Sequence, residues 1–456
     1  MGFLNLIIRD AKFMIMKKIF LIISLIFLPP LTLAENVITI TNGSSEPIPI
    51  AINNFKGVDP ADISIAKEII AVINNDLSNS GLFRPISPAA FIETKTGIEH
   101  TPLYAAWQQI NANLLLNGEV IKTNSGRLQV KFILWDSILE KQIVSESFEL
   151  PEKLWRRVAH KIADSVYSNI TGYDGYFNTR IVYISESGSY LQRIKRLALM
   201  DQDGANHQYL TNGKDLVLTP RFSPDGKKVL FLSYKNRIPQ VHVLDLISGK
   251  SSLLGNFPGM SFAPRFCPDG DHVVMSIAKG GATNIYEMNL NTKKILQLTE
   301  GKAINTSPCY SPDGKYIVFN SDRSGARQLF TMGRNGSNIQ KVSLGGGSYA
   351  EPNWSGRNFI AFTKKSASNG FTIGLMKPDL TDGQSNERLI ASGYLVESPS
   401  WAPNGRIIVF TKGARNKGKK GVGLNRIYTI DFTGANEHII PTPTDASDAD
   451  WSRVID

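Results

Sequence analysis

The sequence predicts an α/β amino-terminal domain followed by an all-β six-bladed β-propeller, and two observations lead to this prediction. The phrase TPRFSPDG at residues 219–226 recurs at nearly constant spacing, whereas residues 47–173 contain no repeat and alternate helix and strand patterns. A period of about 40–45 residues built from short strands is typical of β-propellers. The copies are APRFCPDG at 263–270, SPCYSPDG at 307–314, EPNWSGR at 351–357, SPSWAPNG at 398–405 and a final DADWSRVID at 448–456.

Each repeat is predicted to hold four strands, A to D, with the phrase forming strand A and the turn into strand B. An apolar run such as 229–232 follows as strand B, and an alternating run such as 241–246 follows as strand C. Pro-Asp-Gly is turn chemistry, because proline fixes φ, aspartate bonds its own backbone and glycine accepts positive φ. Each of these aspartates lacks a second acidic ligand at metal spacing, so we expect turns rather than calcium sites.

One repeat is out of phase, which predicts how the ring closes. Residues 179–211 supply strands B, C and D but no strand A, and residues 450–455 supply a strand A alone. Pairing the two segments gives six complete blades, and closure removes exposed sheet edges. We therefore expect the carboxyl-terminal strand to close the propeller.

The first 34 residues are typical of a secretory signal peptide that is cleaved. Lys17 and Lys18 precede an apolar run at 19–28, and small residues at 32–34 offer a cleavage site. Translation could start at Met1 or at Met16. No cysteine follows the apolar run, so we expect no lipid attachment, and a mature chain that begins at Glu35 and is exported.

The α/β domain is predicted from helix and strand patterns after the leader. Asp59 and Pro60 open a helix that stops at Gly81, and Pro151 opens another that runs to Ile170. Strands are expected at 49–55, 82–86, 114–121, 128–136 and 142–148, with a second helix from Thr101. The full division is a signal peptide at 1–34, a partner-binding tail at 35–46, the α/β domain at 47–173 and the propeller at 174–456.

Composition and charge favour a globular protein that does not bind nucleic acid. The 456 residues are 42% hydrophobic and 20% charged, and the net charge of +10 is spread along the chain. The one basic concentration, residues 412–426, is predicted to be a solvated loop, with an anionic lipid or partner contact as the alternative. Cys267 and Cys309 could form a disulfide in an exported protein or be two separately buried thiols.

No catalytic, cofactor or metal motif is present in the sequence. There is no G-x-S-x-G elbow, no phosphate loop and no H-E-x-x-H, and the six histidines have no ligand spacing. Asp201-Gln202-Asp203-Gly204 is half of a calcium loop and is better explained as a turn between strands C and D. We therefore expect a protein that is not an enzyme and that uses no cofactor or metal.

Function is then expected on a surface, and the propeller offers one where strand D of each blade leads into strand A of the next. These D-to-A segments carry Met260, Phe262 and Tyr349, which look exposed beside small polar residues. Methionine and aromatic anchors suit a protein partner. The alternative is that Phe262 and Tyr349 cover blade cores. The segments are 218–219, 260–263, 304–307, 349–351 and 396–398.

The chain resembles the TolB family, the periplasmic component of the Tol-Pal envelope system. The specific matches are DLSNSGLF at 76–83 and GYFNTRIVY at 175–183, together with the Pro-Asp-Gly repeats. The resemblance covers the whole mature chain. It implies a non-enzymatic, periplasmic protein with an α/β domain and a six-bladed propeller, expected to be a monomer, that maintains outer-membrane integrity and envelope constriction during division.

The resemblance also implies two partners. The lipoprotein Pal is expected on the face formed by the D-to-A loops. Met260, Ala263 and Thr306 stand where the family's contact residues lie, although the family carries histidine at position 260. The predicted Pal-binding residues are Met260, Phe262, Ala263, Asn305, Thr306 and Tyr349.

The second partner is the carboxyl-terminal domain of TolA, which captures the mature amino terminus by strand addition. The predicted TolA-binding residues are Glu35, Asn36, Val37, Ile38, Thr39 and Ile40, whose alternation suits a strand. Other outer-membrane proteins are further candidate partners, and contact with the membrane is expected only through partners. The alternative function is a carbohydrate-binding or polysaccharide-degrading propeller, for which Tyr349 and Tyr394 would form the aromatic platform.

Overall fold

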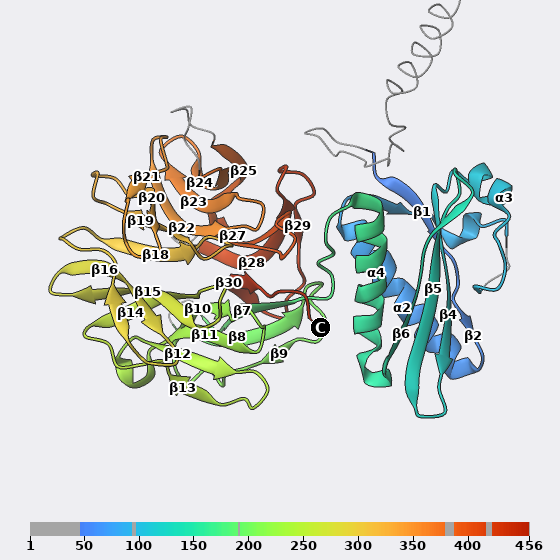
Figure 1. The fold of residues 1–456 in the computed structure, drawn as a ribbon, viewed down its shortest axis with the longest axis horizontal. Helices are drawn as coiled ribbons and strands as arrows, with labels where there is room; N and C mark the ends of the chain where they lie inside the picture. The colour runs from blue at the N-terminus through green and yellow to red at the C-terminus, as the bar shows by residue number, and fades with distance from the viewer. Residues whose placement is uncertain (1–45, 94–96, 190–191, 379–386, 416–421, 456) are drawn as a thin grey trace, which may run out of the picture. The chain divides into compact units, whose positions relative to one another are not determined.

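A computed structural model describes residues 46–93, 97–189, 192–378, 387–415 and 422–455. The first part is a six-stranded sheet in the order β3-β1-β4-β5-β6, with β2 pairing with β4 (Figure 1). Its strands are parallel where β1 meets β3 and β4, and antiparallel from β4 to β6. They are β1 (Ile48–Ile52), β2 (Lys56–Gly57), β3 (Phe83–Pro85), β4 (Leu114–Lys122), β5 (Arg127–Asp136) and β6 (Lys141–Pro151).

Two long helices cover one face of this sheet, and both were predicted, although the second begins at Trp155 rather than at Pro151, which is the last residue of β6. Helix α2 (Pro60–Asn79) begins where Asp59 Oδ1 accepts the backbone N–H of Ala61 and of Asp62, both at 2.9 Å. Helix α4 (Trp155–Thr171) ends at Gly172, whose φ of 70° is the left-handed conformation that glycine tolerates. The helices α2 and α4 pack against each other. Short helices are α3 (Tyr104–Gln109), η1 (Pro88–Ala90), η2 (Glu152–Leu154) and η4 (Lys235–Arg237).

Alternation along β1 divides the core of this part into two layers. Ile50 and Ile52 are buried with the apolar faces of α2 and α4. Ala51 points the other way, into a smaller cluster that contains Trp107 of α3 and Leu115 of β4. None of the helices that the structure describes is long and apolar enough to cross a membrane.

The rest of the described chain is a six-bladed β-propeller of four-stranded antiparallel sheets, as predicted. The innermost strands of neighbouring blades contact one another around a central channel. They are β10 (Val217–Phe222), β14 (Met260–Phe266), β18 (Asn305–Tyr310), β22 (Ser348–Trp354), β26 (Leu395–Trp401) and β30 (Asp445–Trp451). The other strands are β7 (Arg180–Ser187), β8 (Ile194–Asp201), β9 (Gln208–Tyr209), β11 (Lys228–Ser233), β12 (Gln240–Asp245), β13 (Ser251–Leu253), β15 (His272–Lys279), β16 (Ala282–Asn289), β17 (Ile295–Gln297), β19 (Tyr316–Ser321), β20 (Gln328–Gly333), β21 (Gln340–Lys341), β23 (Ile360–Ser366), β24 (Gly370–Met376), β25 (Arg388–Gly393), β27 (Ile407–Arg415), β28 (Val422–Asp431) and β29 (His438–Ile439).

The predicted closure by the carboxyl-terminal strand is confirmed, although the strand lies at Asp445–Trp451 rather than at 450–455. Strand β30 pairs antiparallel with β7, from Asp445 opposite Glu186 to Trp451 opposite Ile181, in the sheet β30-β7-β8-β9. The Trp451 indole N–H donates to Thr179 Oγ1 at 2.8 Å. One blade therefore joins the two ends of the propeller sequence.

Every innermost strand is interrupted by the same bulge, at which its register shifts. The residue before the repeat's proline, or before Ala449 in the last copy, has positive φ, an uncommon conformation for a residue with a Cβ. These residues are Thr219, Ala263, Ser307, Glu351, Ser398 and Asp448, with φ between 47° and 56°. We call the end of the channel before the bulges the D–A face and the end with the A-to-B turns the A–B face.

The repeat's turns form as their chemistry predicts. Asp225 Oδ1 accepts the backbone N–H of Lys227 at 3.0 Å, and Gly226 has a φ of 67°. Cys267 and Cys309 are both buried and unbonded to each other, so the alternative of two separate thiols is the correct one.

Candidate protein-interaction site

An apolar arc lies on the D–A face across three consecutive blades. Leu216, Met260 and Ile304 each precede their blade's proline by four residues, and their side chains are 41%, 46% and 47% exposed. Equivalent positions in a propeller occupy equivalent places around the channel, so the three side chains form one row. Of these three residues, only Met260 was predicted as a site residue from the sequence. The signal that would have found the other two is the same apolar position in each repeat.

Three other predicted site residues lie just inside this arc. Phe262 and Ala263 on β14 and Thr306 on β18 are each partly buried. Thr306 Oγ1 accepts a hydrogen bond from Asn320 Nδ2 at 2.7 Å. The other amide atom, Asn320 Oδ1, is buried and has no partner among the residues that the structure describes. Position 306 is therefore small and polar, beside an unused acceptor.

Asn305 and Tyr349 are fully buried, so the expectation that Tyr349 is exposed is wrong. Asn305 donates to the carbonyl oxygen of Thr283 at 3.1 Å and accepts from Arg323 Nη2 at 2.8 Å. The Tyr349 hydroxyl donates to Glu387, and its ring packs in a blade core. The alternative in which Tyr349 covers a blade core is therefore correct. The side chains of Asn305 and Tyr349 both lie buried beneath the exposed rim of the D–A face. Residues 35–40, predicted to bind TolA, lie outside the described residues.

The channel behind the D–A face is acidic. Glu351 Oε2 accepts from the Ser398 backbone N–H at 2.7 Å and from Thr363 Oγ1 at 2.9 Å. The Ser398 hydroxyl also donates to Asp448 Oδ1 at 3.1 Å, which draws two carboxylates together. Burial raises the pKa of Glu397 to about 8, and the charges of Glu351 and Asp448 act in the same direction.

Replacing Glu397 with glutamine is expected to flatten the dependence of stability on pH. The folded pKa of about 8 lies above the ordinary value of 4.5, so between these pH values the folded state holds a proton that the unfolded state has lost. Stability therefore falls as pH rises through this range, and Glu397→Gln removes that loss. Thermal unfolding at pH 5 and pH 8 measures it, with the variant more stable at pH 8. Glu300→Gln on the surface is the control, and identical pH profiles for Glu397→Gln and the wild type would contradict the expectation.

A second polar cluster joins the α/β part to the propeller. His160 of α4 is 2% exposed, and its Nδ1 lies 2.6 Å from Asp76 Oδ2 of α2. Asp76 Oδ1 accepts from Gln202 Nε2, in the turn between β8 and β9, at 2.8 Å. Burial lowers the pKa of His160, but the carboxylates of Asp76 and Asp203 outweigh it and leave the pKa raised. The His160–Asp76 pair thus lies inside the α/β part, and the hydrogen bond from Gln202 to Asp76 makes the contact with the propeller.

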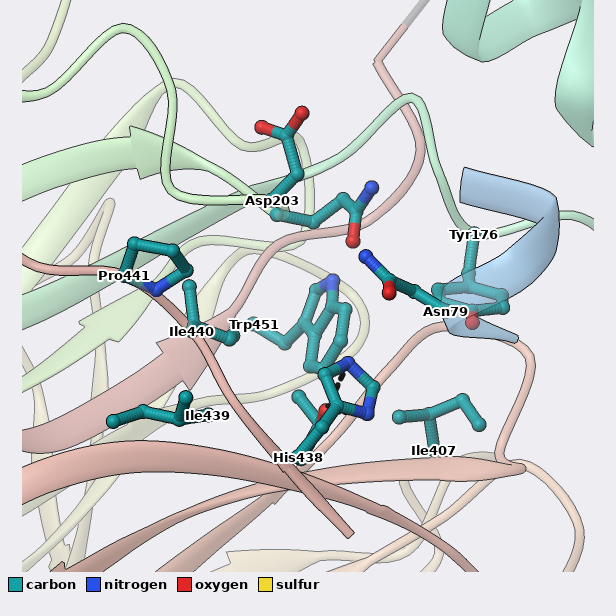
Figure 2. Close-up of a pocket in the computed structure, with 11 residues that line it drawn as sticks. Asn79, Tyr176, Asp203, Ile407, His438, Ile439, Ile440, Pro441 and Trp451 are labelled. Carbon is teal, nitrogen blue, oxygen red and sulfur yellow. Dashed lines mark hydrogen bonds between the residues drawn. The ribbon is translucent and has the colours of Figure 1, made fainter. Parts of the chain in front are cut away.

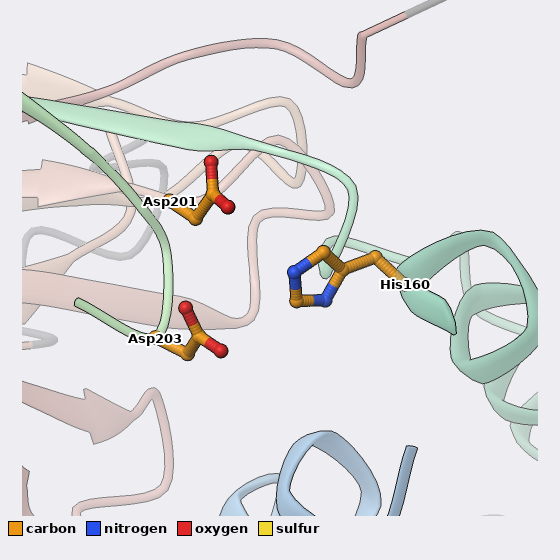
Figure 3. A group of neighbouring side chains, drawn as sticks. All are labelled: His160, Asp201 and Asp203. Carbon is orange, nitrogen blue, oxygen red and sulfur yellow. The ribbon is translucent and has the colours of Figure 1, made fainter. Parts of the chain in front are cut away.

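The same turn carries Asp201 and Asp203, which face His160 (Figure 3). The turn forms as predicted, with the Gly204 N–H donating to the Asp201 carbonyl at 3.0 Å. Ligand atoms of His160, Asp201 and Asp203 lie within 4.8 Å of one another, a spacing that could suit a metal. However, Arg156 of α4 forms ion pairs with both aspartates. The Arg156 guanidinium already occupies both carboxylates, so we assign the cluster to the contact between the two parts.

A small cavity lies beside this cluster (Figure 2). Asn79 and Tyr176 line it together with Trp451 and His438 of the propeller. About 30 Å³ of it is open to water, which is room for one or two water molecules. The Asn436 side chain reaches across nearby and donates to the Asn79 carbonyl at 2.6 Å. Water-sized space among polar groups suits hydration rather than a small-molecule ligand.

The aromatic platform for carbohydrate does not form. Tyr394 is 48% exposed, but Tyr349, the other predicted member, is fully buried. Of the two tyrosines predicted to stack against a sugar, only Tyr394 is therefore exposed. The D–A face is better suited to a protein, because the apolar arc on it consists of aliphatic and methionine side chains.

Comparison with known proteins gives a consistent family. Residues 167–455 match the family model of the TolB beta propeller domain, and residues 36–143 match that of the TolB amino-terminal domain. The Tol-Pal system protein TolB of Rickettsia massiliae (strain Mtu5) is 56% identical over 442 residues, which cover 96% of this chain and 99% of the relative. That of Rickettsia bellii (strain OSU 85-389) is 55% identical, over 92% of this chain and 96% of the relative. The crystal structure of TolB from Acinetobacter baumannii has the same fold, with a TM-score of 0.79 at 23% identity, over 90% of this chain and 98% of that one.

Proposed function

The chain belongs to the TolB family of the Tol-Pal system, and from this premise we propose that it binds the lipoprotein Pal on the D–A face and TolA through its mature amino terminus. It is then a non-enzymatic periplasmic scaffold that supports outer-membrane integrity and division. The proposal includes the division into a cleaved leader at 1–34, a tail at 35–46, an α/β domain at 47–173 and a propeller at 174–456.

The apolar arc of Leu216, Met260 and Ile304 carries the Pal proposal. Exposed aliphatic and methionine side chains in one row favour a protein partner, because a contiguous exposed apolar patch on a folded protein marks an interaction surface. Phe262, Ala263 and Thr306 extend the arc toward the channel. Asn305 and Tyr349 are proposed to support the rim, since both are buried beneath it.

A calorimetric titration tests this proposal. The mature chain, residues 35–456, is titrated with the soluble domain of Pal from the same organism. We expect saturable binding with one-to-one stoichiometry. Absence of binding by a well-folded chain, judged from its thermal unfolding, would overturn the assignment of Pal as partner.

Deleting residues 35–46 is expected to abolish TolA binding and to leave the fold unchanged. The described fold begins at β1 (Ile48–Ile52), so the deletion removes none of its strands. Pull-down with the carboxyl-terminal domain of TolA measures the loss, and the melting temperature measures the fold.

The matched control keeps residues 35–40 and replaces 41–46 with glycine and serine, which preserves the proposed strand but changes the linker. This control is expected to bind TolA. A deleted chain that still captured TolA would show that the binding segment lies elsewhere.

A further inference from the structure

The residue that follows each bulge forms a ring around the central channel. Each member comes directly after the repeat's proline, or after Ala449 in the last copy, and all six line the same cavity at the A–B face. The cavity has a volume of about 520 Å³, within the range of about 300–1,000 Å³ of small-molecule sites. The members are Arg221, Arg265, Cys309, Asn353, Ser400 and Asp450.

This ring carries more positive than negative charge. Arg265 Nη1 lies 3.3 Å from Asp450 Oδ1, and Arg221 Nε lies 4.0 Å from the same oxygen. The Asp450 carboxylate also accepts hydrogen bonds from the Ser400 hydroxyl at 2.9 Å and from the Phe222 backbone N–H at 2.8 Å. One carboxylate therefore serves two arginines, and the exposed Arg453 at the cavity edge adds another positive charge.

Most of the donors on the two guanidiniums are unused. Arg221 is 8% exposed, and it donates only to the carbonyl oxygen of Pro220, at 2.6 Å, among the residues that the structure describes. Arg265 donates only to Asp450 within the same set. Each guanidinium has five N–H donors, and those without a protein partner reach the open cavity rather than being buried. Burial lowers the pKa of Arg221, and the charge of Arg265 acts in the same direction, although Asp450, Asp448 and Glu351 oppose it.

The next residue of every repeat adds an aromatic wall above the charged ring. All six border the same cavity, but Tyr310, Trp401 and Trp451 are only 4–7% exposed, so the partly exposed rings of Phe222, Phe266 and Trp354 supply the surface on which a planar group can lie. The six residues are Phe222, Phe266, Tyr310, Trp354, Trp401 and Trp451. The cavity thus combines a positively charged floor with apolar walls.

We propose that this cavity binds a small organic oxyanion, whose carboxylate or phosphate pairs with Arg221 and Arg265 and whose body lies against the aromatic wall. Arginine binds both groups through two parallel hydrogen bonds. The site lies on the far side of the bulges from the D–A face, so its occupation is separate from the proposed Pal contact.

Calorimetry of the mature chain with three probes tests this inference. Inorganic phosphate supplies the anion alone, benzoate supplies a carboxylate on a ring, and phenyl phosphate supplies a phosphate on a ring. We expect at least one ring-bearing probe to bind saturably at one-to-one stoichiometry and more tightly than inorganic phosphate. The better of benzoate and phenyl phosphate distinguishes the two acid groups.

Two substitutions with opposite expected effects on the affinity for the probe locate the binding site. Arg265→Gln is expected to weaken the ring-bearing probe by about tenfold or more, because hydrogen bonds to a charged group are lost. Asp450→Asn is expected to tighten binding, because it removes the competing carboxylate, and Arg237→Gln in the exposed helix η4 is the control. If Asp450→Asn does not fold, Arg265→Lys replaces it. This variant keeps the positive charge but loses the paired N–H donors of the guanidinium, so its affinity is expected to lie between those of the wild type and Arg265→Gln.

Three results would overturn the inference. They are no saturable binding of any probe by the folded wild type, equal affinities for phosphate and the ring-bearing probes, and unchanged binding by folded Arg265→Gln.

Discussion

Thr306→Arg is expected to lower the affinity for the soluble domain of Pal by about 100-fold or more, the effect of a central interface residue. Thr306 is small, partly buried and next to the apolar arc. Arginine there places a long cation between Met260 and Ile304, where a complementary surface has no room for it. Calorimetric titration of wild type and variant with Pal measures the difference.

The fold is expected to survive this substitution. Thr306 contributes one hydrogen bond, to Asn320, and belongs to the rim rather than to a blade core. Thr292→Arg is the matched control, because it makes the same change at an exposed turn between β16 and β17, away from the D–A face. If the folded Thr306→Arg chain bound Pal with wild-type affinity, the Pal site would have to lie on another surface.

The propeller could be predicted from sequence because each blade is specified by short-range signals. Pro-Asp-Gly fixes the A-to-B turn within a few residues, and the constant spacing then places the strands. Even the closing strand follows from counting, since 179–211 lacks a strand A and 450–455 lacks its partners. The TolB family could be named from two short segments at 76–83 and 175–183.

The rim could be predicted only in part, because exposure there depends on loops that differ between blades. Met260 was identified correctly as exposed, whereas Tyr349 looked the same in sequence and lies in a blade core. The difference is local packing, since the Tyr349 hydroxyl reaches Glu387 from the outer strands of its blade. Leu216 and Ile304 were overlooked because each is an ordinary aliphatic residue until the repeats are aligned.

The contact between the α/β part and the propeller could not be predicted at all. Asp76 and His160 are 84 residues apart and Asp76 and Gln202 are 126 apart, so no spacing signal links them. Asp201 and Asp203 were explained as turn residues, which is correct for their backbone. Their side chains instead pair with Arg156 of α4.

Asp76→Ala is expected to destabilise the protein by about 3–5 kcal/mol, the cost of removing one partner of a buried ion pair. Asp76 has no exposed surface and accepts from both His160 and Gln202. Its loss leaves the His160 imidazole buried beside an empty space and leaves the Gln202 amide without its acceptor. The free energy of unfolding, from denaturant titration at constant pH, measures the effect.

The reason for this cost is tested by a double variant. If the stability comes from the interaction between Asp76 and His160, the double variant Asp76→Ala with His160→Ala loses less unfolding free energy than the sum of the two single variants. The second substitution then removes a buried side chain that the first had left without its partner. Glu68→Ala, on the exposed face of the same helix, is the matched control and is expected to change stability by less than about 0.5 kcal/mol. Additive losses would mean that Asp76 and His160 act independently, and a small loss in Asp76→Ala would mean that this buried polar cluster adds little to the stability of the fold.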